Sequence, residues 1–219
     1  MVTKWIGVGL AALSPCVCQA EVLPIEFDPA LKLWAVEQMP GGTVKARDGV
    51  LEIEDKDGCT VWFRQKLTAP VEITYEVVVI SKGGSLDRVS DVNCFWMATE
   101  PGSKAMPAGR TGRFESYDSL KTYYVGMGGN ENTTTRFRRY AGDGSKPLLP
   151  EHDLRGAEFL LKPNQTYRLK IIARAAVTEF WRDGKLIFSF RDPAALVEGW
   201  FGFRTVHSHL EIRNFSISR

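Results

Sequence analysis

The stretch that decides the fold is QTYRLKIIARAAVTEFWRDGKLIFSF, residues 165–190. Aliphatic and aromatic residues alternate there with charged ones, as in strands that have one buried and one solvated face. Asp183-Gly184 separates two such runs, and this dipeptide is a strong signal for a tight hairpin turn. The stretch therefore predicts a strand over 165–173 and a hairpin of strands 178–182 and 185–190.

Segments of the same kind fill the chain back to residue 21 and on to its end. The further runs with strand composition are 50–54, 60–64, 71–80, 92–98, 122–127, 133–140, 200–206 and 210–218. Turn residues separate them, and hardly any helical periodicity is present. About ten or eleven strands at regular spacing are typical of a two-sheet sandwich. We predict an all-β, antiparallel jelly-roll domain over residues 21–219.

Two long segments interrupt this series, residues 98–120 and residues 141–158. The first carries proline, glycine and basic residues. Long loops within a compact domain are often functional, so we expect 98–120 to form one wall of a binding cleft. Strands 92–98, 122–127, 133–140 and 200–209 are expected to form its floor, on a concave sheet.

The composition supports a buried core but gives little sign of a polyanionic partner. Hydrophobic residues make up 44% of the 219 residues, and the formal net charge is +2. So small a charge does not indicate a nucleic-acid surface. We predict a monomer without a nucleic-acid or membrane partner.

Residues 1–20 have the pattern of a secretory signal peptide. Lys4 precedes an apolar run at 5–13, and a small-residue cleavage site follows at 17–20. The apolar run is too short to span a bilayer. We predict cleavage after Ala20 and a secreted or periplasmic protein, with a buried N-terminal segment as the alternative.

Cleavage at that site would leave two cysteines, Cys59 and Cys94. In an oxidising compartment they form either one disulfide or two separate buried thiols. Two cysteines alone do not complete a structural zinc site.

An ordered series of motifs runs through the C-terminal third. These are YRLKI (167–171), FWRDGK (180–185), DP (192–193), GWFGFR (199–204) and IRNF (212–215). The series resembles concanavalin A-like lectin/glucanase domains, including laminin-G-like modules and keto-disaccharide hydrolase-like domains. The resemblance implies a jelly roll and a sugar-related function. Structural calcium is common in this fold class, although the sequence predicts no cofactor and no metal site.

The middle of the chain resembles a narrower family. Its motifs are DVNCFWMA (91–98), LKTYYVGMGGN (120–130) and NTTTRFRRY (132–140). They resemble a bacterial family of exported proteins related to YesU-type proteins, which are associated with pectin and rhamnogalacturonan breakdown. This resemblance covers roughly residues 25–219 and implies a plant or algal cell-wall polysaccharide, or its oligosaccharides, as partner. It assigns no catalytic residue, because likeness of fold does not fix an activity.

The densest polar cluster lies on the strands 122–127 and 133–140. Strand alternation puts Tyr123 and Tyr124 on opposite faces of the strand 122–127. On the strand 133–140 it puts Arg136 and Arg138 on one face and Arg139 on the other. Paired guanidinium forks suit a carboxylate, so we predict an acidic, uronate-containing ligand. A solvated outer strand is the alternative. The residues expected to bind substrate are Asn93, Trp96, Lys121, Tyr123, Asn130, Arg138, Arg204 and His209.

His207 and His209 are two residues apart at a strand end. They would point the same way if that strand stays extended, and one could then act as a general base near neutral pH. Such a pair can also bind a metal ion, but no third ligand is evident. Surface histidines are the alternative.

Three functions fit these residues. In a polysaccharide lyase, Arg136 or Arg138 would neutralise the carboxylate, His207 would be the base and Tyr124 the acid. A hydrolase would need a dispersed pair such as Glu115 or Asp118, since the Glu-x-Asp-x-x-Glu run of the glucanases is absent. We favour a carbohydrate-active enzyme, with catalytic residues Tyr124, His207 and Arg136, over a non-catalytic carbohydrate-binding module.

Overall fold

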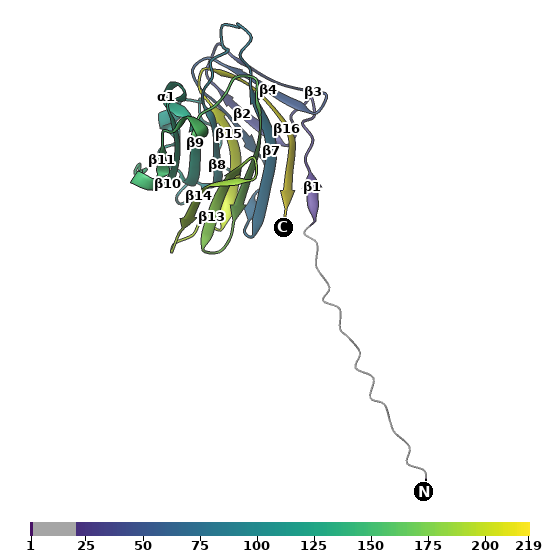
Figure 1. Ribbon diagram of the computed structural model, residues 1–219, viewed down its shortest axis with the longest axis vertical. Coiled ribbons are helices and arrows are strands. Elements are labelled where there is room, and N and C mark those ends of the chain that lie inside the picture. The colour runs from purple at the N-terminus through teal and green to yellow at the C-terminus, as the bar shows by residue number, and fades with distance from the viewer. Residues whose placement is uncertain (2–20) are drawn as a thin grey trace.

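The protein is a sandwich of two antiparallel β-sheets packed face to face (Figure 1). The computed structural model describes residue 1 and residues 21–219. The predicted all-β jelly-roll class is confirmed. The predicted signal peptide and its cleavage site fall almost entirely on residues 2–20, outside the described residues.

We call the two layers the back sheet and the front sheet. The back sheet runs in the order β14 (Lys185–Arg191), β13 (Val177–Arg182), β12 (Thr166–Ala173), β7 (Val71–Val79), β16 (Ser208–Ser218), β4 (Val50–Asp55) and β3 (Thr43–Arg47), with β1 (Val22–Pro24) pairing with β16. The front sheet runs in the order β11 (Asp153–Leu154), β10 (Thr134–Ala141), β9 (Lys121–Gly128), β8 (Val92–Thr99), β15 (Glu198–Thr205), β5 (Cys59–Phe63) and β2 (Trp34–Gln38), with β6 (Leu67–Thr68) pairing with β15. Helical structure among the described residues is confined to α1 (Gly129–Asn132) and the 3-10 turns Phe114–Tyr117, Pro150–His152 and Ala157–Phe159.

The hairpin predicted from the opening stretch is present. β13 and β14 pair in antiparallel register, with Arg182 opposite Lys185. Asp183 and Gly184 between them have φ values of 51° and 78°. Positive φ at both turn residues matches the right-handed twist of a two-residue hairpin, which is why Asp-Gly signals it.

The predicted floor of the cleft is also confirmed as a set of neighbouring strands. β10, β9, β8 and β15 lie side by side in the front sheet.

The strands that flank residues 56–58 belong to different sheets, β4 to the back sheet and β5 to the front sheet. The chain therefore crosses between the layers at this turn and does not form a hairpin there.

The core between the sheets is largely aromatic. The Trp34 ring lies 5.4 Å from the Phe203 ring and 5.1 Å from the Phe215 ring, measured between centroids. Burying each such side chain contributes about 1.5–3 kcal/mol relative to leaving it exposed. The two sheets therefore depend on these contacts for their packing.

Two residues expected to bind sugar belong to this core. Trp96 is fully buried, and its indole nitrogen donates to the Thr178 hydroxyl of the back sheet at 2.8 Å. Tyr123 is equally buried and donates its hydroxyl proton to Asp192 at 2.7 Å. Strand alternation turns both rings inward, so neither offers a face on which a sugar could stack.

Cys59 and Cys94 are two separate buried thiols. They lie on β5 and β8, on opposite sides of β15, where they face Thr205 and Phe203. Two strand spacings of about 4.8 Å each place them beyond the reach of a disulfide. Of the two alternatives, the disulfide is wrong.

We expect both thiols to resist modification in the folded protein. Burial raises the pKa of Cys94 to about 12 and also raises the pKa of Cys59, so the reactive thiolate is scarce at pH 8. Peptide mass spectrometry after treatment with a maleimide should find both peptides unlabelled in buffer and fully labelled in guanidinium chloride. Rapid labelling in buffer would contradict the burial of the two thiols on β5 and β8.

Candidate functional site

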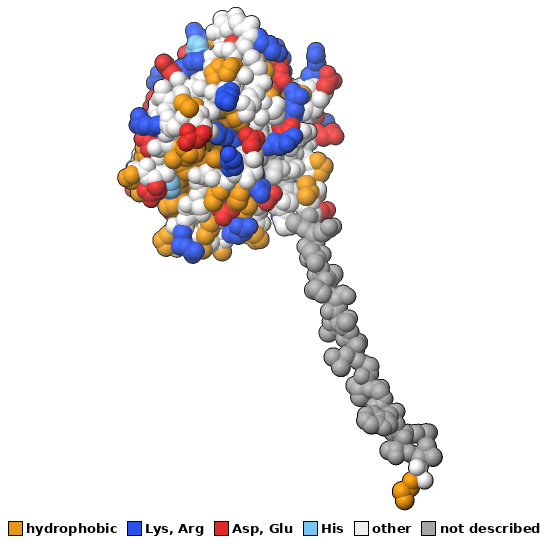
Figure 2. All heavy atoms as spheres, viewed as in Figure 1, with side chains coloured by type: hydrophobic (Ala, Val, Ile, Leu, Met, Phe, Trp, Pro, Cys, Tyr) orange, Lys and Arg blue, Asp and Glu red, His pale blue; other side chains and the backbone are white. Residues whose placement is uncertain are grey.

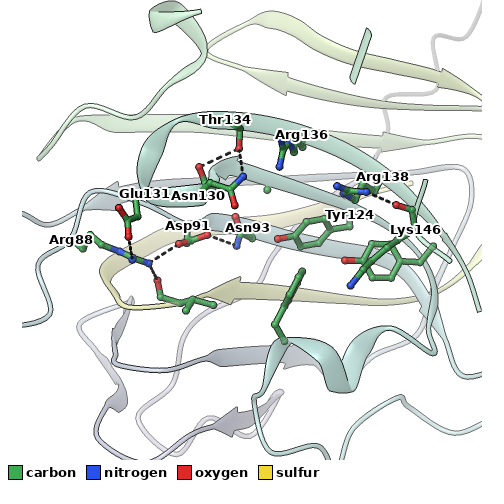
Figure 3. A pocket seen from close by; sticks show the side chains of 15 residues that line it. Arg88, Asp91, Asn93, Tyr124, Asn130, Glu131, Thr134, Arg136, Arg138 and Lys146 are labelled. Atoms are coloured by element: carbon green, nitrogen blue, oxygen red, sulfur yellow. Dashed lines mark hydrogen bonds and ion pairs between the residues drawn. The ribbon is translucent and has the colours of Figure 1, made fainter. Parts of the chain in front are cut away.

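A pocket of about 400 Å³ opens on the outer face of the front sheet (Figure 3). Its floor is formed by side chains of β8, β9 and β10, and its walls come from the loops that adjoin these strands. Five of the residues predicted from the sequence line it. They are Asn93, Tyr124, Asn130, Arg136 and Arg138.

The alternation argued for β10 is confirmed. Arg136, Arg138 and Tyr140 all line the pocket. Arg139 points to the other side of the sheet, where it pairs with Asp192 at 2.6 Å. The two-residue period of a strand thus separated the arginines correctly.

Neither histidine of the predicted pair lines the pocket. β15 ends at Thr205 in the front sheet and β16 begins at Ser208 in the back sheet, so His207 lies where the chain crosses over, with φ of 48°. Because the strand does not stay extended there, the expectation that His207 and His209 point the same way is wrong. His209 contacts Asp87 at 3.0 Å and Glu52, a back-sheet residue, at 3.1 Å. The base that the lyase hypothesis assigned to His207 is therefore missing from the pocket.

Other predicted residues also lie elsewhere. Lys121 is the exposed first residue of β9 and does not line the pocket. Glu115 is exposed, and Asp118 is engaged with Lys146 at 2.6 Å. This leaves the dispersed acid/base pair proposed for a hydrolase without a place in the pocket floor.

The loop 98–120 forms a wall, as predicted, because its Phe114 lines the pocket. The loop also covers the rest of the outer face. Tyr117 and Leu120 are fully buried in a second apolar cluster with Trp62 and Phe95 of the front sheet. The loop thus fills the part of the expected floor around Trp62 and Phe95, beside the pocket.

A buried carboxylate holds this loop in place. Glu37 of β2 accepts hydrogen bonds from the backbone N–H groups of Gly109 and Arg110 at 2.5 and 2.8 Å. It also accepts bonds from the Tyr117 hydroxyl at 2.7 Å and the Trp62 indole at 2.9 Å. Three of the four donors belong to the loop, so the carboxylate ties the loop to the sheet edge.

Arg204, expected to bind substrate, supports the same loop from beneath. It is almost fully buried and donates to the Gly112 carbonyl at 2.8 Å and the Thr60 hydroxyl at 3.0 Å. Its guanidinium lies 5.0 and 4.9 Å from the ring centroids of Phe114 and Tyr117, within the range of a cation–π contact. Arg204 therefore positions the wall and does not itself line the pocket.

Four cationic side chains line the pocket, and three of them have carboxylate partners. Arg136 holds Asp153 with two hydrogen bonds of 2.7 and 3.2 Å, which lower the pKa of Asp153 to about 2. Arg88 pairs with Asp91 at 3.0 Å, and Lys146 with Asp118. These three charges are compensated within the protein.

Arg138 is the exception. The only hydrogen bond of its guanidinium to a described residue goes to the Lys146 carbonyl, and it forms no ion pair within the described part of the chain. It therefore brings to its end of the pocket a positive charge that no carboxylate of the described residues contacts.

The floor adds three polar groups that lack strong partners. Asn93 is 4% exposed; its amide nitrogen donates to Asp91 at 3.3 Å, and its oxygen has no partner among the described residues. The buried Tyr140 hydroxyl is likewise unpaired among them. Burial raises the pKa values of Tyr124 and Tyr140, so both phenols keep their protons at neutral pH. The floor thus offers neutral donors and an amide acceptor, which favour binding over proton transfer.

One wall is a strained turn. Asn130, Glu131 and Asn132 have φ values of 52°, 56° and 59°, in the left-handed region, which asparagine tolerates better than glutamate does. Asn132 fixes the turn, because its side chain bonds both the N–H and the carbonyl of Leu161 at 2.8 and 2.9 Å. Strain held by such contacts is often found beside functional sites.

Sequence reasoning did not single out Arg88, Phe114, Glu131, Lys146 or the anchoring Glu37. All of them lie in loops, turns or a short edge strand, where no periodic pattern marks a direction. Residues 21–219 contain no group of three or more histidine, cysteine or acidic residues placed to bind a metal ion. In the same part of the chain no helix has the length and hydropathy of a membrane span.

A family model described as a domain of unknown function (DUF6250) matches residues 53–215. The chain belongs to this family. No curated protein matches the sequence.

Among solved structures, a Bacillus subtilis protein of unknown function with a galectin-like fold superposes with a TM-score of 0.67 at 17% identity, over 90% of this chain and 94% of that one. The carbohydrate-binding module CBM66 from Bacillus subtilis gives 0.56 at 12% identity, over 85% and 96%. The exoplasmic/lumenal domain of VIP36, bound to Ca²⁺ and Man3GlcNAc, gives 0.55 at 13% identity, over 84% and 83%. At these identities the likeness shows the fold.

We expect the DUF6250 chain to lose its loop anchor when Glu37 is changed. In Glu37→Gln, the amide cannot accept all four hydrogen bonds and brings N–H groups against existing donors. The free energy of unfolding should fall by about 2–4 kcal/mol. Urea denaturation measures this fall, and trypsin should cut faster at Lys104, Arg110 and Arg113 of the loop.

The exposed Glu115 of the same loop provides the control. Glu115→Gln should stay within about 0.5 kcal/mol of the parent protein and keep its resistance to trypsin. Equal stability of the two variants would contradict the anchoring role of Glu37.

Proposed function

We propose that this protein binds carbohydrate in the pocket of the front sheet, and that its ligand carries a carboxylate, as uronate-containing glycans do. Two structures with the same fold support the first part, since one is a carbohydrate-binding module and the other holds Man3GlcNAc. The unbalanced charge of Arg138 carries the second part.

Arg138 suits a carboxylate for three reasons. Its guanidinium is held by the Lys146 carbonyl, so part of its conformational freedom is already lost. Its other N–H groups have no partner among the described residues, and a carboxylate can accept two of them side by side. The two bonds together are expected to contribute about 1.5–3 kcal/mol, the range for hydrogen bonds to charged groups.

The charges outside the pocket do not create a strong field of one sign. Basic and acidic side chains are interspersed over the face shown in Figure 2. Long-range attraction therefore contributes little, and selectivity for an anion rests on Arg138 inside the pocket. The partly exposed ring of Phe114 contributes an apolar part of the wall.

The source of the ligand follows from the sequence resemblance. Likeness to YesU-type proteins supports pectin or rhamnogalacturonan as the polysaccharide, and the signal-peptide pattern supports a secreted or periplasmic protein of one domain. A monomer, and structural calcium as an addition to the fold, stay predictions.

Cleavage of the glycan is the second candidate function. Tyr124 and Arg138 lie in one pocket, and they could supply the acid and the carboxylate-neutralising group of a β-elimination. With His207 elsewhere, no residue of the predicted set fills the place of the base.

Binding should depend on Arg138 only when the sugar is acidic. In titration calorimetry at about 0.15 M salt, Arg138→Met should weaken binding of galacturonate, glucuronate and guluronate oligosaccharides by about 10–100-fold, as expected for loss of 1.5–3 kcal/mol. Neutral galacto-oligosaccharides should bind weakly to the parent and the variant alike.

Arg168 of the back sheet provides the matched control, because it is exposed and pairs with Glu76 away from the pocket. Arg168→Met should bind as the parent does. The proposal fails if no uronate oligosaccharide binds, or if Arg138→Met binds all of them normally. Growth of absorbance near ~235 nm during the titration would instead show a lyase.

A further inference from the structure

Charged side chains form contacts across the pocket at both of its ends. In Figure 3, Arg88, Asp91 and Glu131 lie at one end, and Arg138 and Lys146 at the other, with Asn93 and Tyr124 between them. A groove that holds the middle of a polymer must be open at both ends.

The first closure is built around Arg88. Its guanidinium donates to the Val206 carbonyl at 2.8 Å, the His207 carbonyl at 3.0 Å and Asp91 at 3.0 Å. It also lies 4.0 Å from Glu131, in the strained turn. The segment before β8 and the turn after β9 thus meet across this end, and four contacts fix the arginine that joins them.

The second closure joins the two long loops. Lys146, from the loop after β10, pairs with Asp118 of the loop 98–120 at 2.6 Å. Its ammonium also lies 5.1 Å from the Phe114 ring and 5.9 Å from the Tyr140 ring, and its carbonyl accepts the bond from Arg138. The loops therefore touch beyond Arg138, and the face of the sheet does not continue outward as a channel.

The size and the inner surface suit one small ligand. About 400 Å³ is near the lower end of the range of about 300–1,000 Å³ for small-molecule sites. Two buried polar groups of the floor, the Asn93 amide oxygen and the Tyr140 hydroxyl, have no partner among the described residues. Leaving the Asn93 oxygen unpaired destabilises the empty pocket, and a ligand that donates a hydrogen bond to it would remove that cost.

We propose that the pocket takes the terminal sugar of an acidic glycan, with its carboxylate at Arg138 and a hydroxyl donating to the Asn93 oxygen. This inference rests on the proposed function, since it places a uronate in the same pocket. It adds that the protein reads a chain end and does not bind along the chain. The polar groups agree with it, because the acceptor lies between the ends and the cation lies at one of them.

Chain length separates the two modes of binding. The full chain is titrated with galacturonate oligomers of two, three and six units, or with the uronate series that binds best. For a terminal site, the dissociation constant should vary by less than about 2-fold, with one protein per oligomer whatever its length. An affinity that rises 10-fold or more from two to six units, or several proteins per hexamer, overturns the inference and leaves the proposed function intact. Absence of binding at every length overturns both.

Modified chain ends give an independent test. Reducing the trimer with borohydride changes one end, and a trimer with an unsaturated terminal ring changes the other. One of the two modifications should abolish binding, whereas a site for internal units would tolerate both.

The orientation inside the pocket is tested by Asn93→Ala. It should weaken binding of the unmodified trimer about 10-fold and leave the thermal unfolding midpoint close to that of the parent. Gln165→Ala, an exposed amide outside the pocket, is the matched control and should bind normally. Unchanged binding by Asn93→Ala would exclude the proposed hydrogen bond and with it the orientation.

Discussion

The pocket depends on one buried carboxylate. Glu37 lies on β2 at the edge of the front sheet, and its oxygens accept bonds from two backbone N–H groups and one hydroxyl of the loop 98–120. A carboxylate removed from water requires this number of donors, and the loop supplies most of them. With the loop held down, Tyr117 and Leu120 fill the outer face and Phe114 is left as a wall. The outer face of the front sheet becomes a bounded pocket because the buried Glu37 carboxylate needs hydrogen-bond donors, and the loop 98–120 supplies most of them.

The compensation of charge then decides what the pocket can attract. Arg88, Arg136 and Lys146 each have a carboxylate partner, so they shape the walls and contribute little net charge. The only side-chain partner of Arg138 among the described residues is the neutral Lys146 carbonyl. Four basic side chains line the pocket, but three of them are paired with carboxylates. Only Arg138 keeps a guanidinium that is available to an anionic ligand. The proposals of an acidic ligand and of a site for its terminal sugar both rest on which side chains are already engaged.

Much of the fold could be predicted because strand signals are local. Asp183-Gly184 specified its own hairpin, and the period of two placed Arg138 and Arg139 on opposite faces before any contact was known. The same rule placed Tyr123 and Tyr124 on opposite faces, but it did not say which face was the core. The short strands near the N-terminus, β1, β2 and β3, were not predicted. For this reason Glu37, which lies on β2, was not recognised as an anchor. The histidine pair failed for a related reason, since the extended strand it needed changes sheets at His207.

The sequence by itself determined most of the strands, their alternation and the jelly-roll class, because these depend on neighbours within a few residues. Only the tertiary structure decided where the pocket lies, how far the loop 98–120 covers the sheet and which arginine keeps an unbalanced charge. Those features rest on contacts between residues far apart in the chain, such as Glu37 with Tyr117, 80 positions away. No local pattern records such a pairing, since a carboxylate and a phenol at that separation meet only after the sheets have formed.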